Sequence, residues 1–205
     1  MRSVTRPKLK PQNVSGKFTE PKIFYRKVMK VNKLEIERLI TERLILIPYT
    51  KNLCINILNG NYNDLKILNL TRGKSWPDED VMDTLPRIIN NLDKVEYPTG
   101  YESWIIIKKE TSEIIGDLGF KRFNSEEENI DLGYGIIKEE RRKGYAKEAV
   151  SEIIKWAFPN KFVKEITANC SNENVGSINL LNKFNFIKLK TENNMIYWNL
   201  SNVNN

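Results

Sequence analysis

Apolar runs in the first half of the chain predict one strand followed by two short helices. The strand is the run Leu44–Ile47, which is followed directly by Pro48, a residue without the N–H that a strand ladder requires. Residues 51–70 have helix-like spacing of apolar positions, but Asn59-Gly60-Asn61 interrupts the pattern. The interruption predicts two short helices in place of one long helix.

A third helix is predicted to begin just after Trp76. Its first turns are rich in carboxylates, namely Asp78, Glu79, Asp80 and Asp83. Carboxylates favour the positive end of the helix dipole, so a solvated helix start is the simpler explanation, although these groups could also attract a cationic substrate. Pro86 lies inside the same pattern and predicts a kink.

The second half of the chain is richer in strands. Apolar, β-branched segments predict three antiparallel strands at 104–107, 114–123 and 130–137. An amphipathic helix is predicted at 144–158, because its apolar positions repeat at i, i+3, i+4 and i+7. The remaining segments predict a strand at 166–168, a helix at 175–184 and strands at 186–189 and 195–200. This order predicts an α/β (α+β) fold with a mixed, mainly antiparallel sheet of about seven strands flanked by helices.

Size and charge indicate one domain, at 34–205, with a basic extension at 1–33. The chain has 205 residues, of which 40% are hydrophobic and 29% are charged. The first 33 residues hold ten Lys/Arg against the single acid Glu20, whereas the remainder has a net charge of −2. The basic surplus therefore belongs to the extension and gives no support for nucleic-acid binding by the domain. A flexible leader is the simplest expectation, and a weak RNA tether, an organellar transit peptide or a translation start at Met29 are the alternatives.

Missing residue types exclude several kinds of chemistry. The sequence has no histidine, which removes Ser-His and Cys-His catalysis and most zinc sites, so no metal is expected. Acid–base chemistry must then use carboxylates, hydroxyls, lysine or water. Cys54 and Cys170 are expected to be buried free thiols. Neither an 18-residue apolar run nor a secretory signal is found, so we expect a cytoplasmic protein without a membrane partner.

The most informative segment is the basic turn between the strand at 130–137 and the helix at 144–158. A helix N-terminus presents free backbone N–H groups and the positive end of a dipole, an arrangement that binds phosphates. Gly144 would let the backbone approach a pyrophosphate closely, and Arg141, Arg142 and Lys143 add charge. The segment matches neither the P-loop nor the dinucleotide pattern. The residues alone leave a phosphate site and a solvated basic loop as alternatives.

This turn, 141–146, resembles the (Q/R)-x-x-G-x-(G/A) acetyl-CoA pyrophosphate loop of GNAT superfamily N-acetyltransferases. Residues 41–46 and 115–120 resemble the opening and central strands of the RimJ/RimL-like branch, which includes ribosomal-protein-alanine N-acetyltransferases. Residues 174–186 resemble the family's second motif, an N-x-x-S helix followed by a K-x-G-F turn. The resemblance covers about Leu39 to Leu200. It implies a GNAT fold and acetyl transfer from acetyl-CoA, as cosubstrate, to a primary amine.

The resemblance also implies which residues contact acetyl-CoA. These are Ile136, Ile137, Arg141, Arg142, Lys143, Gly144, Tyr145, Ala146, Asn174 and Ser177. The backbone N–H of Ile136 or Ile137 would bind the thioester oxygen, and Asn174 could instead be a helix cap. Two positions depart from the family pattern, since Arg142 and Asn185 stand where glycine is usual. Asparagine tolerates a left-handed backbone, whereas a bulky Arg142 could shift the loop.

Acetyl transfer needs a base for the amine and a proton for the departing thiolate. Asp131 is the first candidate base, because it shares a strand face with two glycines that leave room for a ligand. A structural role for Asp131 is the alternative, and Glu102 and Asp117 are further candidate bases. Several relatives use a tyrosine on the last helix for the thiolate, but 180–182 lacks one, so Ser177 is the candidate. Tyr134 is expected to belong to the core rather than to stack on substrate.

The acceptor amine is not identified by the sequence. A protein N-terminal α-amine is the leading prediction, and a small-molecule amine such as an antibiotic, a polyamine or an amino-acid derivative is the first alternative. A non-catalytic acyl-CoA-binding or RNA-associated module that uses the basic extension is the second. A homodimer is left open, because no residue pattern identifies an interface.

Overall fold

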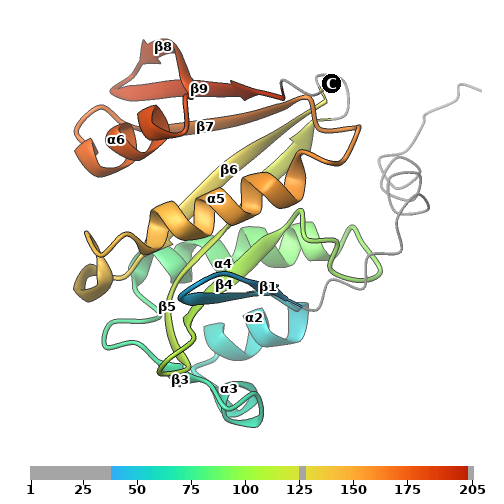
Figure 1. The fold of residues 1–205 in the computed structure, drawn as a ribbon. Coiled ribbons are helices and arrows are strands. Elements are labelled where there is room, and N and C mark those ends of the chain that lie inside the picture. Colours follow the sequence, from blue (N-terminus) through green and yellow to red (C-terminus); the bar gives the residue numbers. More distant parts are fainter. Residues whose placement is uncertain (1–37, 125–127, 203–205) are drawn as a thin grey trace, which may run out of the picture.

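The computed structural model describes residues 38–124 and 128–202, and the predicted basic extension at 1–33 lies outside the described residues. Within this part, a single mixed sheet has the strand order β1-β2-β4-β5-β6-β7-β9-β8, and β3 pairs with β5 (Figure 1). The strands are β1 (Leu39–Ile40), β2 (Leu44–Pro48), β3 (Thr71–Arg72), β4 (Ser103–Lys108), β5 (Glu113–Asn124), β6 (Asn129–Ile136), β7 (Glu165–Ser171), β8 (Ile187–Glu192) and β9 (Met195–Ser201).

The predicted mixed, mainly antiparallel sheet is confirmed. Only the pairings β6–β7 and β3–β5 are parallel among the described strands. Seven strands have five or more residues, as predicted, and the two additional strands, β1 and β3, have two residues each. Two residues are too few to produce a periodic sequence signal, which explains why these strands were not predicted.

The helices also follow the predicted pattern. They are α2 (Lys51–Leu58), α3 (Asn63–Ile67), α4 (Glu79–Leu92), α5 (Tyr145–Ala157) and α6 (Val175–Lys183), with a short 3-10 turn η1 (Lys138–Glu140). The predicted carboxylate-rich start of α4 is confirmed, because Asp78 caps the helix by accepting a hydrogen bond from the Val81 N–H. The helix continues through Pro86. None of the described helices combines the length and the apolar composition that crossing a bilayer requires.

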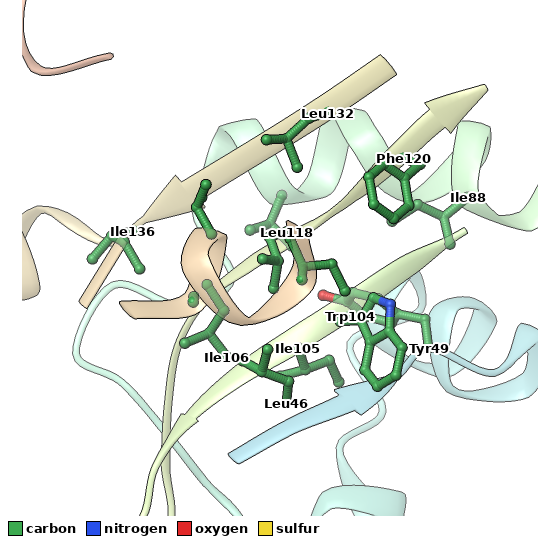
Figure 2. Close-up of a cluster of buried hydrophobic side chains, with 14 of the residues drawn as sticks. Leu46, Tyr49, Ile88, Trp104, Ile105, Ile106, Leu118, Phe120, Leu132 and Ile136 are labelled. Atoms are coloured by element: carbon green, nitrogen blue, oxygen red, sulfur yellow. The ribbon is translucent and has the colours of Figure 1, made fainter. Parts of the chain in front are cut away.

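Helix α5 covers one face of the sheet, and α2 and α4 cover the opposite face of its N-terminal half (Figure 1). The edge-to-face contact of Trp104 in β4 with Trp156 in α5, with ring centroids 5.6 Å apart, identifies the α5 face. Figure 2 shows the core between these layers, where Trp104 and Leu118 are buried beside Phe120. Trp76, Cys54 and Cys170 are also buried, and both cysteines are free thiols, as predicted.

The sheet face opposite α5 stays partly open over β7 and β9. Along β7 every second residue is buried, and the alternating residues Thr167 and Asn169 are only half-buried. The same alternation runs along β9, where Tyr197 and Asn199 are half-buried. Paired residues of neighbouring strands project from the same face, so these polar side chains form one open polar face.

Candidate active site

Strands β6 and β7 begin as a parallel pair and then separate. Residues 129–132 of β6 pair with residues 165–168 of β7, and the pairing ends at Leu132 and Ala168. Beyond this point β6 continues to Ile136, whereas β7 pairs only with β9. Figure 1 shows the two strands diverging toward α6 and the start of α5. The separation leaves the backbone groups of β6 beyond Leu132 without a strand partner on the β7 side. We call the gap between the two strands beyond Leu132 and Ala168 the strand opening.

The direction of these backbone groups follows from the pairing of β6 with β5. The Ile137 N–H donates to the Ile115 carbonyl oxygen over 2.9 Å, and Ile136 is opposite Gly116 in the antiparallel register. Because N–H groups alternate in direction along a strand, those of Ile136 and Tyr134 point away from β5, toward the strand opening. Ile137 is therefore not free to bind a thioester oxygen through its N–H, contrary to that part of the prediction. The backbone N–H groups of Ile136 and Tyr134 are the ones that could bind a thioester oxygen.

The predicted phosphate loop leads into the N-terminus of α5. Gly144 is the N-cap residue with φ +87° and, having no side chain, leaves the first N–H groups of the helix uncapped. Uncapped N–H groups and the helix dipole favour an anion at this point. Arg142 (φ +62°) and Asn185 (φ +59°), at the two positions where the resemblance led us to expect glycine, both have left-handed backbone. The Asn185 turn is thus retained, as expected, and Arg142 occupies a conformation that favours glycine.

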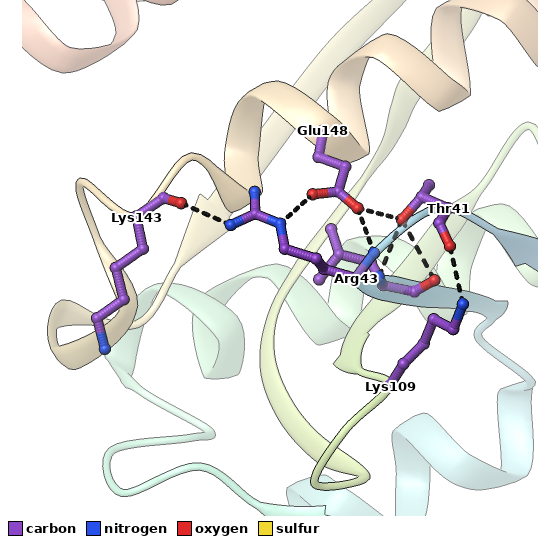
Figure 3. A network of polar contacts seen from close by, with 6 residues as sticks. Thr41, Arg43, Lys109, Lys143 and Glu148 are labelled. Carbon is purple, nitrogen blue, oxygen red and sulfur yellow. Dashed lines mark hydrogen bonds and ion pairs between the residues drawn. The ribbon is translucent and has the colours of Figure 1, made fainter.

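A polar network holds the loop against the N-terminal part of the sheet (Figure 3). Arg43 donates from Nη1 to the Lys143 carbonyl oxygen over 3.0 Å, and its Nε pairs with Glu148 Oε2 at 2.7 Å. Glu148 Oε1 accepts hydrogen bonds from the Arg43 N–H at 2.7 Å and from Thr41 Oγ1 at 2.5 Å. Burial alone would raise the pKa of Glu148, but the hydrogen bonds from Thr41 and Arg43 lower it below its ordinary value. The Arg43 guanidinium also stacks over the Tyr145 ring, 4.7 Å from its centroid.

The three basic side chains of the loop differ in what they contact. Arg141 donates from Nε to the Ile136 carbonyl oxygen over 2.7 Å, which fixes the end of β6 to the loop. Lys143 Nζ lies 3.1 Å from Glu140 Oε2. Arg142 is exposed and has no ion pair within the described part of the chain. Arg142 therefore has no carboxylate partner here that would compete with an external anion.

Helix α6 brings two predicted residues to the far side of the strand opening. Asn174 is its N-cap, and the Oδ1 atom accepts a hydrogen bond from the Ser177 N–H over 3.0 Å. The capping role uses this oxygen, so a cofactor contact by Asn174 would have to use its Nδ2. The Ser177 side chain faces the hydroxyl of Tyr134, whose pKa is raised by burial and lowered in part by Ser177. Tyr134 thus reaches from β6 to α6, a relationship that the strand pattern alone did not indicate.

Asp131 projects from the face of β6 opposite α5, toward the open polar face. Its Oδ2 lies 3.8 Å from Lys121 Nζ, and Lys121 also donates to Asn169 Oδ1 over 3.3 Å. The Asp131 Oδ1 atom is buried and has no hydrogen-bond partner within residues 38–124 and 128–202. A buried, unsatisfied carboxylate oxygen is rare and is consistent with a ligand contact.

The two alternative bases have different surroundings. Both Glu102 oxygens accept hydrogen bonds of 2.8 Å from Thr99, so this buried carboxylate organises the loop before β4. Within the described residues, the Asp117 carboxylate forms no ion pair and no hydrogen bond to another residue, and its Oδ1 lies 3.4 Å from the Cβ position of Gly135. Burial, reinforced by Asp78, raises the pKa of Asp117 to about 7. A carboxylate with this pKa can accept a proton at neutral pH.

Comparison with known proteins gives matches in sequence and in structure. The acetyltransferase (GNAT) domain model matches residues 43–187. The uncharacterized N-acetyltransferase YjdG of Bacillus subtilis (strain 168) is 36% identical over 127 residues, which is 62% of this chain and 76% of that protein.

Two solved structures illustrate the similarity of fold. The ribosomal-protein-S5-alanine acetyltransferase from Vibrio fischeri superposes with a TM-score of 0.54 at 17% identity, covering 81% of this chain and 97% of that one. The microcin C7 self immunity acetyltransferase MccE, in complex with acetyl-CoA and AMP, superposes with a TM-score of 0.54 at 13% identity, covering 78% and 93%.

Proposed function

The chain belongs to the acetyltransferase (GNAT) domain family and is an N-acetyltransferase, and from this premise we propose that it transfers the acetyl group of acetyl-CoA to a protein N-terminal α-amine. The observation that carries the proposal is the junction of the strand opening with the uncapped N-terminus of α5. This junction joins a phosphate-binding element to a strand with free backbone N–H groups. A cosubstrate that has a pyrophosphate at one end and a thioester at the other needs both.

The pyrophosphate of acetyl-CoA would bind at the loop 141–146. The uncapped N–H groups of α5 supply donors, and Gly144 allows close approach. The exposed Arg142 supplies positive charge, and the Arg43 guanidinium lies beside Gly144. The MccE structure, which contains acetyl-CoA and has the same fold, is consistent with this use of the fold.

The acyl end of the cosubstrate would lie along β6. The N–H groups of Tyr134 and Ile136 point into the strand opening and could donate to the pantetheine amide and to the thioester oxygen. A donor aimed at the thioester oxygen stabilises the negative charge that develops there as the amine attacks. Ser177, across the opening, would hydrogen-bond to the sulfur.

The acceptor amine would approach from the face opposite α5, where Asp117 and Asp131 project. Either carboxylate could take the amine proton, and the pKa of about 7 favours Asp117. An α-amine has a reference pKa of about 8 and a lysine amine of about 10.4, so Asp117 is better matched to an α-amine. The partly open polar face over β7 and β9 offers Asn169 and Asn199 as partners for an extended peptide. The ribosomal-protein acetyltransferase among the similar folds is in line with such an acceptor.

Isothermal titration with acetyl-CoA and CoA tests cosubstrate binding. We expect Gly144→Asp, which places a negative charge at the phosphate site, to weaken binding about tenfold or more. Gly60→Asp is the matched control, because Gly60 also has left-handed backbone but lies in open space, in the turn after α2. Absence of binding by the wild-type protein would overturn the proposal.

An acceptor panel then tests the substrate class. Thiol release from acetyl-CoA is measured with peptides that have free or blocked N-termini and with small amines, including a polyamine. We expect the highest kcat/KM for free peptide N-termini. Faster turnover of small amines would assign the chain to small-molecule acetylation and leave the cosubstrate proposal standing.

A further inference from the structure

The helix α6 lacks a tyrosine that could protonate the departing thiolate, but a tyrosine reaches this region from the sheet. Tyr134 is opposite Leu118 in β5, and Leu118 is opposite Trp104 in β4. Since paired residues share a face and Trp104 contacts α5, the Tyr134 side chain lies on the α5 and α6 side of the sheet. It is also the second residue beyond Leu132, where β6 and β7 stop pairing.

The Tyr134 hydroxyl is buried yet lacks a hydrogen-bond partner of regular geometry within the described residues. Burial is the main reason that the pKa of Tyr134 is raised. Ser177 of α6 lowers this pKa and Cys170 of β7 raises it, so both neighbours belong to the other side of the strand opening. The phenol thus lies at the strand opening, near Ser177 of α6. The Ser177 side chain is close to this hydroxyl but does not give it a regular hydrogen bond. A buried hydroxyl with incomplete hydrogen bonding is costly and needs an explanation. A ligand sulfur in the strand opening would provide the missing partner.

We propose that the Tyr134 hydroxyl donates the proton that the CoA thiolate gains in the acetyl transfer described above, an inference that rests on that proposed function. The neutral amine nitrogen attacks the thioester carbonyl carbon, a C–N bond forms and the C–S bond breaks. The thiolate sulfur takes the Tyr134 proton, and the phenolate regains a proton from solvent through Ser177. The proton lost by the amine leaves through the carboxylate on the opposite face. Tyr134 is then the catalytic acid, and Ser177, which contacts the sulfur and returns the proton to the phenolate, is a second catalytic residue.

Tyr134→Phe removes only the hydroxyl, so it separates this role from packing. We expect kcat to fall about 100-fold, while the KM for acetyl-CoA and the Kd for CoA stay within about threefold. Thermal stability should change little, because the hydroxyl makes no hydrogen bond of regular geometry and only its approach to Ser177 is lost. Tyr62→Phe is the matched control, since Tyr62 lies before α3 beneath Arg72 and should turn over like the wild type. The decrease in kcat should be smaller for Ser177→Ala than for Tyr134→Phe.

The dependence of kcat on pH is a second measurement, and it should not change if Tyr134 has only a structural role. The alkaline limb of kcat should be absent in Tyr134→Phe, and a fluorinated tyrosine at position 134, with its more acidic phenol, should shift that limb to lower pH. Unchanged kcat in Tyr134→Phe, or an unmoved alkaline limb, would overturn this inference while wild-type turnover keeps the proposed function. If the wild-type protein releases no thiol with any amine, both proposals fail together.

Discussion

Arg43 in the loop before β2 forms an ion pair with Glu148 in the first turn of α5, with Nε 2.7 Å from Oε2. The pair joins residues that are 105 positions apart in sequence. Through Nη1, the same guanidinium holds the carbonyl oxygen of Lys143, next to the N-cap Gly144. The position of the proposed phosphate loop therefore depends on a contact with a residue that lies about 100 positions earlier in the sequence.

Replacement of Glu148 should loosen this loop. We expect Glu148→Gln to lower the free energy of unfolding by about 1–2 kcal/mol, because charged hydrogen bonds to Arg43 and Thr41 are lost. The pKa of Glu148 is lowered in the folded state from an ordinary 4.5, so the difference from wild type should be full above pH 4.5 and shrink at lower pH. Urea denaturation at several pH values measures this effect. Glu152→Gln, at a pair of 3.9 Å with the exposed Lys155 on the same helix, is the control and should change the free energy of unfolding little.

Arg142 offers a test of backbone strain. A non-glycine residue with left-handed φ costs about 1 kcal/mol, and glycine offsets part of the relief by its freedom in the unfolded chain. We expect Arg142→Gly to raise the free energy of unfolding by about 0.5 kcal/mol, and Arg142→Ala to leave it nearly unchanged. Both variants should weaken acetyl-CoA binding at low salt, because a loop charge is lost. A glycine variant less stable than the alanine variant would contradict the strain argument.

Gly116 and Gly135, on neighbouring strands, should respond very differently to a methyl group. A Cβ on Gly116 would lie 2.1 Å from the Gly135 carbonyl oxygen, a backbone atom that cannot move away. A Cβ on Gly135 would meet only Asp117 Oδ1, at 3.4 Å. We expect Gly116→Ala to lose about 3 kcal/mol or fail to fold, and Gly135→Ala to fold with reduced kcat/KM because the acceptor face is crowded. Equal stability of the two variants, measured by thermal unfolding, would contradict the β5–β6 register.

The sequence predicted those parts of the site that depend on local patterns. The helix that becomes α5 follows from the spacing of its apolar residues, whereas the roles of the loop 141–146 and of the N-x-x-S helix rest on the resemblance to the family. The left-handed backbone at Asn185 was expected for the same reason. The seven longer strands follow from apolar runs.

Features set by contacts between distant segments could not be predicted in the same way. The assignment of a free N–H to Ile136 and not to Ile137 depends on which of them bonds with Ile115 in another strand. The approach of Tyr134 to Ser177 depends on where β6 and β7 separate. Such relationships require the register, and a one-residue difference in register reverses every side chain of a strand.

The raised pKa of Asp117 leads us to expect that replacing this residue increases stability and decreases activity. Burial, with Asp78 and Asp80, raises this pKa from 3.8 to about 7, against the influence of Arg87. Between these values the unfolded chain binds fewer protons than the folded one, so stability falls as pH rises from about 4 to 7.

Asp117→Asn stays neutral, so we expect it to match the wild type near pH 4 and to exceed it by about 2 kcal/mol at pH 8 in urea denaturation. Its kcat/KM should fall, and the acid limb near pH 7 should disappear, because no carboxylate remains at position 117 to take the amine proton. Asp93→Asn, at an exposed pair with Lys51, controls for loss of one charge and should alter neither property. If Asp131→Asn removes the acid limb and Asp117→Asn retains it, then Asp131 is the base. In that case the raised pKa of Asp117 reflects its burial alone.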